Sequence, residues 1–272
     1  MAKRILITGS TDGIGLEAAK ILAGQGHELI LQGRNATKIA AVKAAHSTVA
    51  KAESFCCDLS DLTATDSMAR DIVKSYASLD VLINNAGVFK SPSSKAANGM
   101  DIRFVVNTLS PYLLAKSLLP IIPKTGRIIN VSSAAQMPVN MGMMRGQVPI
   151  SASMAYAQSK LALTMWSRDM ARNLPDGPVV IAVNPGSLLG TKMVKEAYGT
   201  EGKDIGIGSD ILTRLALDAE FTDASGLYYD NDRGRLGPPH SDALDEQKTS
   251  EVVGFIQALL LPFKMTRCSR FE

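Results

Sequence analysis

Cysteine and histidine are scarce in this sequence, and their spacing excludes two kinds of site. The 272 residues include three cysteines, with Cys56 next to Cys57 and Cys268 near the C-terminus, and three histidines that lie far apart. An odd number of cysteines, two of them adjacent, offers no disulfide framework and is typical of a reducing compartment. No His/Cys spacing of the zinc-binding kind is present, so we expect no metal site.

Long apolar runs and a strong charge of either sign are also absent. A Gln and a Pro interrupt the apolar stretch at 252–263, and no segment has the roughly 18 uninterrupted apolar residues of a membrane span. The N-terminal apolar run ends at Thr8 and Gly9, too soon for a secretory signal. The net charge of +3 is too small to favour nucleic acid as a partner. We therefore expect a cytoplasmic protein without a membrane anchor.

The chain alternates between short apolar runs and stretches of helical periodicity. With 46% hydrophobic and 20% charged residues, its composition is that of a globular protein. Runs rich in Val, Ile and Leu are typical of strands buried on both faces, and they lie at 4–8, 28–32, 53–57, 81–85, 127–133 and 179–183. Helical stretches lie between them at 16–24, 62–76 and 161–174.

This alternation predicts an α/β fold with a doubly wound parallel β-sheet, as in the Rossmann fold, and helices on both faces. The run at 226–230 would bring the sheet to about seven strands. No repeat and no Pro/Gly/Ser-rich linker divides the chain. We predict a single domain over residues 1–261, followed by a tail over residues 262–272.

A glycine-rich loop follows the first predicted strand. Gly9 permits a tight turn, Gly13 lets the backbone approach a phosphate without a Cβ in the way, and Gly15 lets the next helix pack closely on the strand. The N-terminus of that helix presents free N–H groups and a partial positive charge to an anion. This context favours a pyrophosphate site. The alternative is a turn that only connects the two elements.

Tyr156 and Lys160 are four residues apart in a stretch of helical periodicity, so their side chains share one helix face. A free tyrosine has a pKa of about 10, and a nearby ammonium lowers it by favouring the phenolate. A tyrosine with a lowered pKa can exchange protons near neutral pH. Such a pair also arises by chance on many helices, and Ser132 and Ser133 could simply close a strand.

Taken together and in order, the motifs resemble those of the short-chain dehydrogenases/reductases. The first loop has the spacing Gly-x3-Gly-x-Gly, residues 84–87 read Asn-Asn-Ala-Gly, and residues 184–186 read Asn-Pro-Gly. Tyr156 and Lys160 follow between the last two motifs. The resemblance covers about Lys3 to Thr191 and then the run at 226–230.

The resemblance implies an oxidoreductase that transfers a hydride between a nicotinamide cofactor and a carbonyl or alcohol. It implies that Tyr156 is the general acid/base and that Ser133 hydrogen-bonds the reacting oxygen. Lys160 would also bind the nicotinamide ribose, and Asn107 would link Lys160 to solvent through water, unless Asn107 is only a buried amide with satisfied bonds. A homodimer or homotetramer through the long helices would fit the family.

The resemblance also implies which residues hold the cofactor. The segment at 84–87 props up the sheet beside it, and Asp58 stands where the family contacts adenine, with a helix N-cap as the alternative. The full set of implied cofactor residues is Gly9, Ser10, Thr11, Asp12, Gly13, Ile14, Gly15, Arg34, Asp58, Leu59, Asn85, Ala86, Gly87, Tyr156, Lys160, Pro185, Gly186 and Thr191.

The end of the second predicted strand favours NADP(H) over NAD(H). An enzyme selective for NAD usually carries an acidic residue there for the ribose 2′-hydroxyl, whereas this chain has Gly33-Arg34-Asn35. A guanidinium pairs with a 2′-phosphate through charge-assisted hydrogen bonds. The alternative is that Arg34 is a solvated loop cation.

The interval between Ser133 and Tyr156 is longer than in most members of the family. The insertion, residues 134–155, carries Met137, Met141, Met143, Met144 and Met154. Flexible methionines adapt to irregular apolar shapes, and a similar insertion occurs in retinol-dehydrogenase-like members, so we expect a lipophilic ketone or aldehyde as the substrate. The alternative is that these methionines pack on another subunit or fill a crevice.

Two other functions compete with this interpretation. A non-catalytic NADPH-binding sensor would have no physical need for Ser133, Tyr156 and Lys160 together. A sugar-nucleotide epimerase would need a larger C-terminal domain than this chain offers. The sequence therefore favours an NADP(H)-dependent carbonyl reductase acting on a small molecule.

Overall fold

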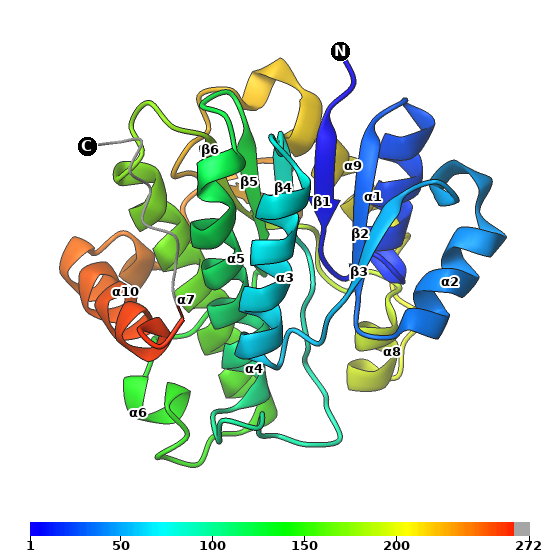
Figure 1. Ribbon diagram of the computed structural model, residues 1–272. Helices are drawn as coiled ribbons and strands as arrows, with labels where there is room; N and C mark the ends of the chain where they lie inside the picture. The colour runs from blue at the N-terminus through cyan, green and yellow to red at the C-terminus, as the bar shows by residue number, and fades with distance from the viewer. Residues whose placement is uncertain (264–272) are drawn as a thin grey trace.

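The computed structural model describes residues 1–263, and its centre is one eight-stranded β-sheet (Figure 1). The strand order is β3-β2-β1-β4-β5-β6-β7-β8. The strands are β1 (Arg4–Ile7), β2 (Glu28–Gly33), β3 (Glu53–Cys56), β4 (Val81–Asn84), β5 (Arg127–Val131), β6 (Val179–Asn184), β7 (Tyr228–Asp230) and β8 (Arg235–Gly237). Neighbouring strands are parallel except β7 and β8, which are antiparallel. The doubly wound α/β fold expected from the sequence is confirmed.

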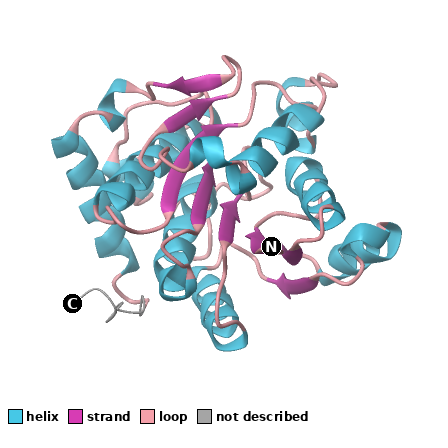
Figure 2. Cartoon of the chain, turned by 90° about the horizontal axis from the view of Figure 1, so that it is seen from above, coloured by secondary structure: helices cyan, strands magenta, loops and turns pink. Residues whose placement is uncertain are grey.

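Helices lie on both faces of the sheet (Figure 2). The α-helices are α1 (Gly13–Gly24), α2 (Ala36–Ala45), α3 (Leu62–Ser75), α4 (Ile102–Phe104), α5 (Ser110–Leu118), α6 (Met141–Met144), α7 (Ala152–Arg172), α8 (Lys192–Tyr198), α9 (Gly206–Leu217) and α10 (Glu246–Leu260). A π-helical turn, η2 (Val105–Leu109), joins α4 to α5. Short 3-10 turns are η1 (Ser47–Val49), η3 (Leu119–Ile121), η4 (Ala219–Phe221) and η5 (Ser241–Ala243).

Two hydrophobic clusters, one on each face, hold the helices to the sheet. In β1, Leu6 belongs to one cluster and Ile5 and Ile7 to the other, so this strand is buried on both faces. The first cluster joins the sheet to α3, α5, α7 and α10, and the second joins it to α1 and α9. The edge strand β3 differs, because all its residues are exposed except the half-buried Phe55. The expectation that this run is buried on both faces is wrong.

The sequence did not reveal one strand. β8 has three residues, of which only Leu236 is a large apolar residue, so it leaves no apolar run to detect. Helix α7 begins at Ala152, before the helical stretch at 161–174, and the Ser151 hydroxyl caps it by accepting a 3.4 Å hydrogen bond from the Met154 N–H. The expectation that Tyr156 and Lys160 lie on one helix is confirmed.

The long helix α7 is enclosed by other helices of the same chain. Helix α10 lies along it (Figure 1). Trp166 of α7 is fully buried and packs edge-on against Tyr112 of α5, with ring centres 5.4 Å apart. The phenol oxygen of Tyr112 accepts a 2.9 Å hydrogen bond from Nε2 of Gln257 on α10. These contacts tie α5, α7 and α10 into one layer.

Among residues 1–263, one helical segment has the length and composition of a membrane span. It runs from Ile102 to Ile121, and 83% of its most apolar window is buried inside the structure. The segment consists of α4, η2, α5 and η3. Because the core helix of a globular protein meets the same criterion, the segment is weak evidence for a membrane span.

Asp61, and not Asp58, caps helix α3. The Asp61 carboxylate accepts hydrogen bonds from the N–H groups of Thr63 and Ala64, at 2.8 and 3.1 Å. The Asp58 carboxylate accepts only from the N–H of Ser60, at 2.9 Å, in the turn before the helix. The alternative interpretation of Asp58 as the helix cap is therefore wrong.

We expect Asp61→Ala to lower the free energy of unfolding by about 1 kcal/mol, because the first turn of α3 loses its acceptor. Urea denaturation of the cofactor-free protein measures the change. Asp58→Ala is the matched control, since it removes a carboxylate from the same loop without uncapping the helix, and its effect should be smaller. A larger loss in the control would contradict the assignment of the cap.

Candidate active site

The glycine-rich loop forms the turn from β1 into α1. Gly9 and Gly13 have φ angles of +64° and +52°, which favour glycine over other residues. A methyl group on Gly9 would lie 2.9 Å from the Cα of Ala86, so a side chain at this position would collide with backbone. Of the other residues implied for this loop, Ser10 and Gly15 are buried, Thr11 and Ile14 are half-buried and Asp12 is exposed.

The segment that follows β4 is hydrogen-bonded to this turn and fixes its backbone. The amide of Asn85 donates to the carbonyl oxygens of Thr8 and Gly9, at 2.9 and 3.2 Å. In return, the hydroxyl of Thr8 accepts from the N–H groups of Asn85 and Ala86, both at 3.0 Å. A methyl group on Gly15 would lie 2.3 Å from the Asn85 amide nitrogen. The glycines therefore let three segments pack closely at the carboxyl ends of β1 and β4. These are the turn after β1, the start of α1 and the segment after β4.

Gln32 is a buried residue of this region that the sequence reading missed. Its side-chain oxygen accepts from the N–H of Gly9 at 3.0 Å, and its side-chain nitrogen donates to the carbonyl of Cys57 at 2.7 Å. It thereby joins the ends of β1 and β3 across β2. The signal that could have revealed it is a glutamine that directly follows the apolar run Leu29–Leu31 in the buried part of the strand.

Three charged side chains lie near the loop on the side of β2. Arg34 is exposed and follows β2 directly. Lys38 of α2 forms a 2.7 Å ion pair with Asp12, which also caps α1 by accepting from the N–H of Gly13 at 2.8 Å. The hydrogen bond from Lys38 lowers the pKa of the Asp12 carboxyl. Among residues 1–263, Arg34 has no ion-pair partner, so its guanidinium is available to an anion.

The remaining implied cofactor residues lie around the same edge of the sheet. Asp58 is exposed and Leu59 is 6% exposed, both after β3. Pro185 and Gly186 follow β6, and Thr191 caps α8 with its hydroxyl. A methyl group on Gly13 would lie 3.5 Å from the Thr191 side chain, so the segment after β6 reaches the glycine loop.

Tyr156 and Lys160 lie together on α7. The ammonium nitrogen of Lys160 is 5.7 Å from the centre of the Tyr156 ring. Lys160 is 3% exposed, whereas Tyr156 is half-buried. Burial lowers the pKa of Lys160 to about 8, and the ammonium donates a 2.7 Å hydrogen bond to the carbonyl of Val131 at the end of β5. A cation at this position favours the phenolate form of Tyr156.

The two serines after β5 differ in environment. The hydroxyl of Ser132 is buried and lies 2.7 Å from that of Thr164 and 3.1 Å from the carbonyl of Lys160. Ser133 is half-buried, and its hydroxyl accepts from the N–H of Ala135 at 3.1 Å. Ser132 is therefore enclosed within the fold, whereas Ser133 is the more accessible of the two.

Tyr228 holds Ser133 in place and was missed by the sequence reading. Its phenol donates a 3.0 Å hydrogen bond from β7 to the carbonyl oxygen of Ser133. Burial raises the pKa of Tyr228, which keeps the phenol protonated as a donor. No local motif marks this residue, because its partner lies 95 positions away in the chain.

Asn107 is fully buried within the π-helical turn η2. Its side chain accepts from the N–H of Val88 at 2.8 Å and donates to the Val88 carbonyl and the Ser159 hydroxyl, both at 3.0 Å. A methyl group on Gly87 would lie 3.4 Å from the Lys160 nitrogen and 3.5 Å from the Asn107 oxygen. Asn107 and Lys160 therefore flank Gly87. The water link between them stays a prediction.

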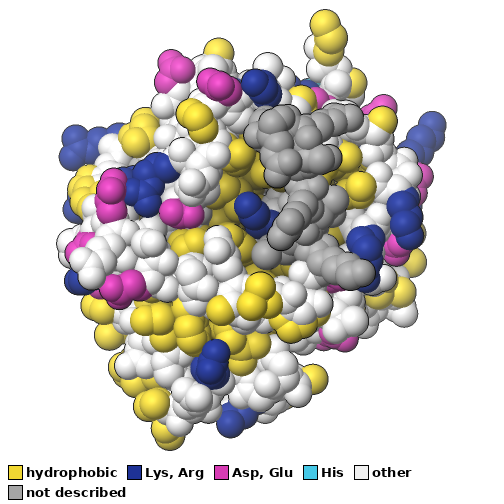
Figure 3. Space-filling model, turned by 60° about the vertical axis from the view of Figure 1, so that its left-hand side comes forward, with side chains coloured by type: hydrophobic (Ala, Val, Ile, Leu, Met, Phe, Trp, Pro, Cys, Tyr) yellow, Lys and Arg dark blue, Asp and Glu magenta, His cyan; other side chains and the backbone are white. Residues whose placement is uncertain are grey.

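The insertion before Tyr156 divides its methionines between the core and the surface. Met144 of α6 is fully buried, and the sulfur of Met143 accepts a 3.6 Å hydrogen bond from Gln158. Met137 is 39% exposed. On the face brought forward in Figure 3, hydrophobic side chains gather in the lower half, on the side of the molecule that carries α6 and α10. Only the exposed part of this set is available to a substrate.

The residues at the carboxyl ends of the strands fit a dinucleotide. The fold changes direction at β1, where β2 and β4 lie on either side, and ligands of doubly wound sheets bind at such a point. Gly13 keeps the N-terminus of α1 clear of a side chain, and Arg34 supplies a free cation beyond β2. Within residues 1–263, no three His, Cys, Asp or Glu side chains are arranged to hold a metal ion.

Comparisons with known proteins agree with this geometry. The model of the short chain dehydrogenase family matches residues 3–202. Human polyprenol dehydrogenase is 30% identical over 94% of this chain and 86% of that protein. Human retinol dehydrogenase 11 is 34% identical over 68% of this chain and 61% of that protein. A short chain dehydrogenase of Burkholderia cenocepacia in complex with NADP has a TM-score of 0.66 and 26% identity, covering 84% of this chain and 95% of that one.

The fold, the site and these matches define an oxidoreductase that binds a nicotinamide cofactor and acts on a CH–OH group of a small molecule. The chain belongs to the short-chain dehydrogenase family.

The buried ammonium of Lys160 predicts a pH dependence of stability. Below pH 8, Lys160 is protonated in the folded and unfolded states alike, and burial of the charge destabilises the fold. Between pH 8 and 10.5 the folded state binds fewer protons than the unfolded state, so stability rises with pH. Urea denaturation of cofactor-free wild type and Lys160→Met from about pH 7 to 10 should show the wild type gaining about 2 to 3 kcal/mol relative to the variant. A difference that does not change with pH would contradict the lowered pKa.

Proposed function

We propose that this protein is an NADP(H)-dependent carbonyl reductase that interconverts a lipophilic ketone or aldehyde and the corresponding alcohol, with Tyr156 as the general acid/base. The observation that carries the proposal is the buried Lys160 ammonium, 5.7 Å from the centre of the Tyr156 ring. A buried cation is costly to maintain, and beside a phenol it favours the phenolate, the form that takes up a proton in the reaction.

Each residue has a defined task in this reaction. The bound nicotinamide would supply the hydride in reduction and accept it in oxidation. Tyr156 gives its phenolic proton to the substrate oxygen in reduction and takes it back in oxidation, while Lys160 favours the phenolate. The Ser133 hydroxyl donates a hydrogen bond to the same oxygen and orients the carbonyl. Asn107 links Lys160 to solvent through water.

The cofactor would lie along the carboxyl ends of β1, β2 and β4. The glycine loop Gly9–Gly15 would hold the pyrophosphate, and Arg34 would pair with the 2′-phosphate. Asp58 and Leu59 would contact adenine, and Lys160 would bind the nicotinamide ribose. The side of the cofactor away from Arg34 would be lined by Asn85, Ala86 and Gly87. The nicotinamide end would be covered by Pro185, Gly186 and Thr191. The solved relative with NADP supports this choice of cofactor.

A lipophilic substrate is favoured by the chain and by its relatives. The exposed Met137 of the insertion and the half-buried Phe89 beside Tyr156 offer apolar surface near the proton donor. Two similar proteins are named for polyprenol and retinol, which are lipophilic alcohols.

The same proposal includes a single domain over residues 1–261, a cytoplasmic location and a homodimer or homotetramer. Helix α10 covers α7 within the chain, so a partner surface on this side would have to include α10. The proposed tail at 262–272 and the reduced state of Cys268 concern residues that lie almost wholly outside the described part of the chain.

Tyr156→Phe tests the proton transfer. We expect kcat to fall at least about 100-fold, because the proton donor is lost, while NADPH binding persists. The measurement follows NADPH absorbance with a panel of ketones and aldehydes of increasing alkyl length, and cofactor fluorescence reports binding. Tyr112→Phe is the matched control, since it removes a buried phenol bonded to Gln257 away from the site.

Equal turnover by wild type and Tyr156→Phe would contradict the assigned acid/base. Binding of NADPH by the wild type without turnover of any substrate in the panel would instead support the non-catalytic sensor.

Arg34→Ala tests the preference for NADP(H). The Kd for NADPH should rise about 10- to 100-fold, because the 2′-phosphate loses a charge-assisted pair, whereas the Kd for NADH should not change. Fluorescence titration measures both constants. Arg235→Ala is the control, since Arg235 is an exposed arginine on β8, at the opposite edge of the sheet. Equal weakening of NADPH and NADH binding would show that Arg34 does not read the 2′-phosphate.

A further inference from the structure

Asp101 and Arg103 form an ion pair inside the protein, beside the site described above. Their side chains are 7% and 5% exposed. Nη1 of Arg103 donates to both carboxylate oxygens of Asp101, at 3.0 and 2.8 Å. Asp101 also accepts from the backbone N–H of Arg103 at 2.9 Å, which caps α4. These bonds fix the guanidinium in one orientation, although burying the two charges is unfavourable in itself.

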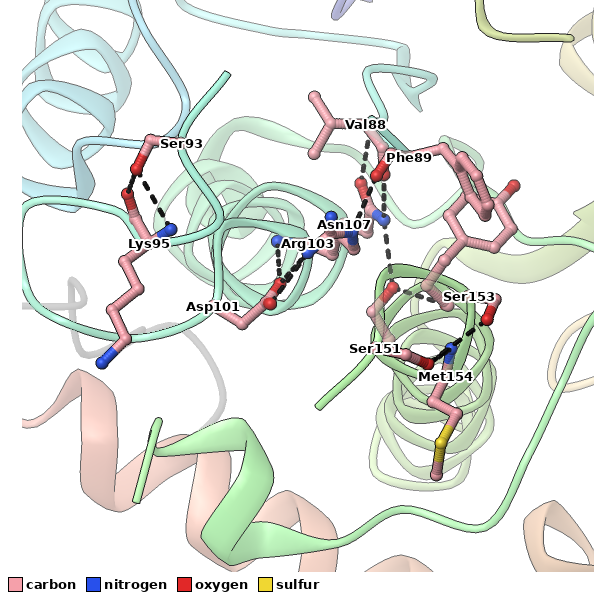
Figure 4. A network of polar contacts seen from close by, with 12 residues as sticks. Val88, Phe89, Ser93, Lys95, Asp101, Arg103, Asn107, Ser151, Ser153 and Met154 are labelled. Atoms are coloured by element: carbon pink, nitrogen blue, oxygen red, sulfur yellow. Dashed lines mark hydrogen bonds and ion pairs between the residues drawn. The ribbon is translucent and has the colours of Figure 1, made fainter. Parts of the chain in front are cut away.

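The fixed guanidinium holds the backbone of the segment that follows β4. Nε of Arg103 donates a 2.7 Å hydrogen bond to the carbonyl oxygen of Phe89. Asn107, one turn further along the same helical segment, binds both the N–H and the carbonyl of Val88. Figure 4 shows these contacts, with Arg103 between Asp101 and Phe89 and with Asn107 beside Val88. The backbone of residues 88 and 89 is thereby attached to α4 and η2.

The side chain of Phe89 contacts the proposed proton donor. Its ring meets that of Tyr156 edge-on, with centres 5.2 Å apart and planes at 72°. Edge-to-face contact between aromatic rings is attractive and depends on orientation, so a ring held in this way limits the rotation of its neighbour. A chain of contacts therefore runs from Asp101 through Arg103 and Phe89 to Tyr156.

We propose that Asp101 and Arg103 are positioning residues for Tyr156 and act through Phe89. The inference rests on the proposed function, in which the Tyr156 phenol transfers a proton. While the carbonyl of Phe89 is held, its ring stays against Tyr156, and the phenol keeps one orientation toward Lys160 and the reacting oxygen. Without that hydrogen bond Asn107 still holds Val88, but the carbonyl of Phe89 loses its contact with Arg103, and the Phe89 ring can shift away from Tyr156.

Two single variants separate the links of this chain. Arg103→Lys keeps a positive charge beside Asp101 but removes the Nε donor to Phe89. Phe89→Leu keeps an apolar side chain and the backbone carbonyl but removes the ring. Each should lower kcat about 10- to 100-fold, because a displaced acid is poorly aligned, with little change in the KM for NADPH. Because a loss of folded protein would also lower the apparent kcat without changing KM, kcat is calculated per NADPH-binding site, as counted by fluorescence titration.

The double variant tests whether the two residues act on one another. If Arg103 works through Phe89, the double variant should lose no more activity than the worse single variant. Independent structural defects would instead multiply, giving the product of the two losses. Multiplied losses would overturn the proposal.

Arg127→Lys is the matched control for loss of a buried arginine. Arg127 is 6% exposed and donates to the carbonyls of Leu215 and Asp218, at 2.6 and 2.7 Å, from the start of β5. This is the end of the strand away from the site. The control should lower thermal stability as Arg103→Lys does and leave kcat unchanged. A fall in kcat that matches that of Arg103→Lys would mean that stability alone explains the effect.

A second measurement does not depend on turnover. In cofactor-free protein labelled with 13C-tyrosine, the Tyr156 resonance is identified by its absence from Tyr156→Phe. Phe89→Leu removes a ring next to Tyr156 and shifts this resonance through the lost ring current alone, so the test is Arg103→Lys, which leaves both rings in place. We expect the resonance to shift or broaden in Arg103→Lys but not in Arg127→Lys. An unchanged resonance in Arg103→Lys would overturn the positioning role. If the wild type turned over no carbonyl, the proposed function would fail, and this spectrum would still decide whether the ion pair positions Tyr156.

Discussion

The burial of the Lys160 ammonium is the constraint that the rest of the site serves. A cation that is 3% exposed requires compensation, and its ammonium donates a hydrogen bond to the carbonyl oxygen of Val131 at the end of β5. That contact fixes the position of α7 relative to the carboxyl end of β5. The same packing brings Tyr156 over the strand ends, because the two residues are one helical turn apart. The lowered pKa of Lys160 and the position of the phenol are therefore consequences of a single packing arrangement.

Around Lys160 and Tyr156, the backbone groups of the loops are held by hydrogen bonds from side chains rather than by hydrogen bonds within the loops. Asn85 holds the glycine turn, Asn107 holds Val88, Arg103 holds Phe89 and Tyr228 holds Ser133. Each of these side chains comes from a helix, a strand or the residue that directly follows one. A hydrogen bond in a low-dielectric interior is strong, and leaving either partner unpaired there is costly, so such bonds give the loops little freedom. The backbone next to the groups proposed to carry chemistry is thus fixed before any ligand binds, which favours preorganised catalysis.

The amino-acid sequence was sufficient for those parts of the structure that rest on local pattern. Alternation of apolar runs and helical stretches predicted the doubly wound sheet, and the glycine spacing predicted a tight turn at Gly9 that the φ angle bears out. Residues that act across long separations left no such signal. Tyr228 contacts Ser133, which lies 95 positions away in the chain. Gln32 joins the ends of β1 and β3, which lie on either side of β2 only in the folded sheet. The exposure of β3 was missed for the same reason, because an edge position is a property of the sheet and not of the run ESFC.

Ser132 and Ser133 have different environments in the fold, although the sequence alone does not distinguish them. The two hydroxyls are adjacent in the chain, but side chains alternate at the end of a strand, so only one can face inward. Ser132 faces α7, where it meets Thr164 and the carbonyl of Lys160. It thereby helps to hold the helix that carries the phenol and the ammonium. Ser133 is half-buried, with its carbonyl tied to Tyr228 and its hydroxyl accepting from the N–H of Ala135. A change at Ser132 would disturb the placement of Lys160, whereas a change at Ser133 would remove a donor and leave that placement intact.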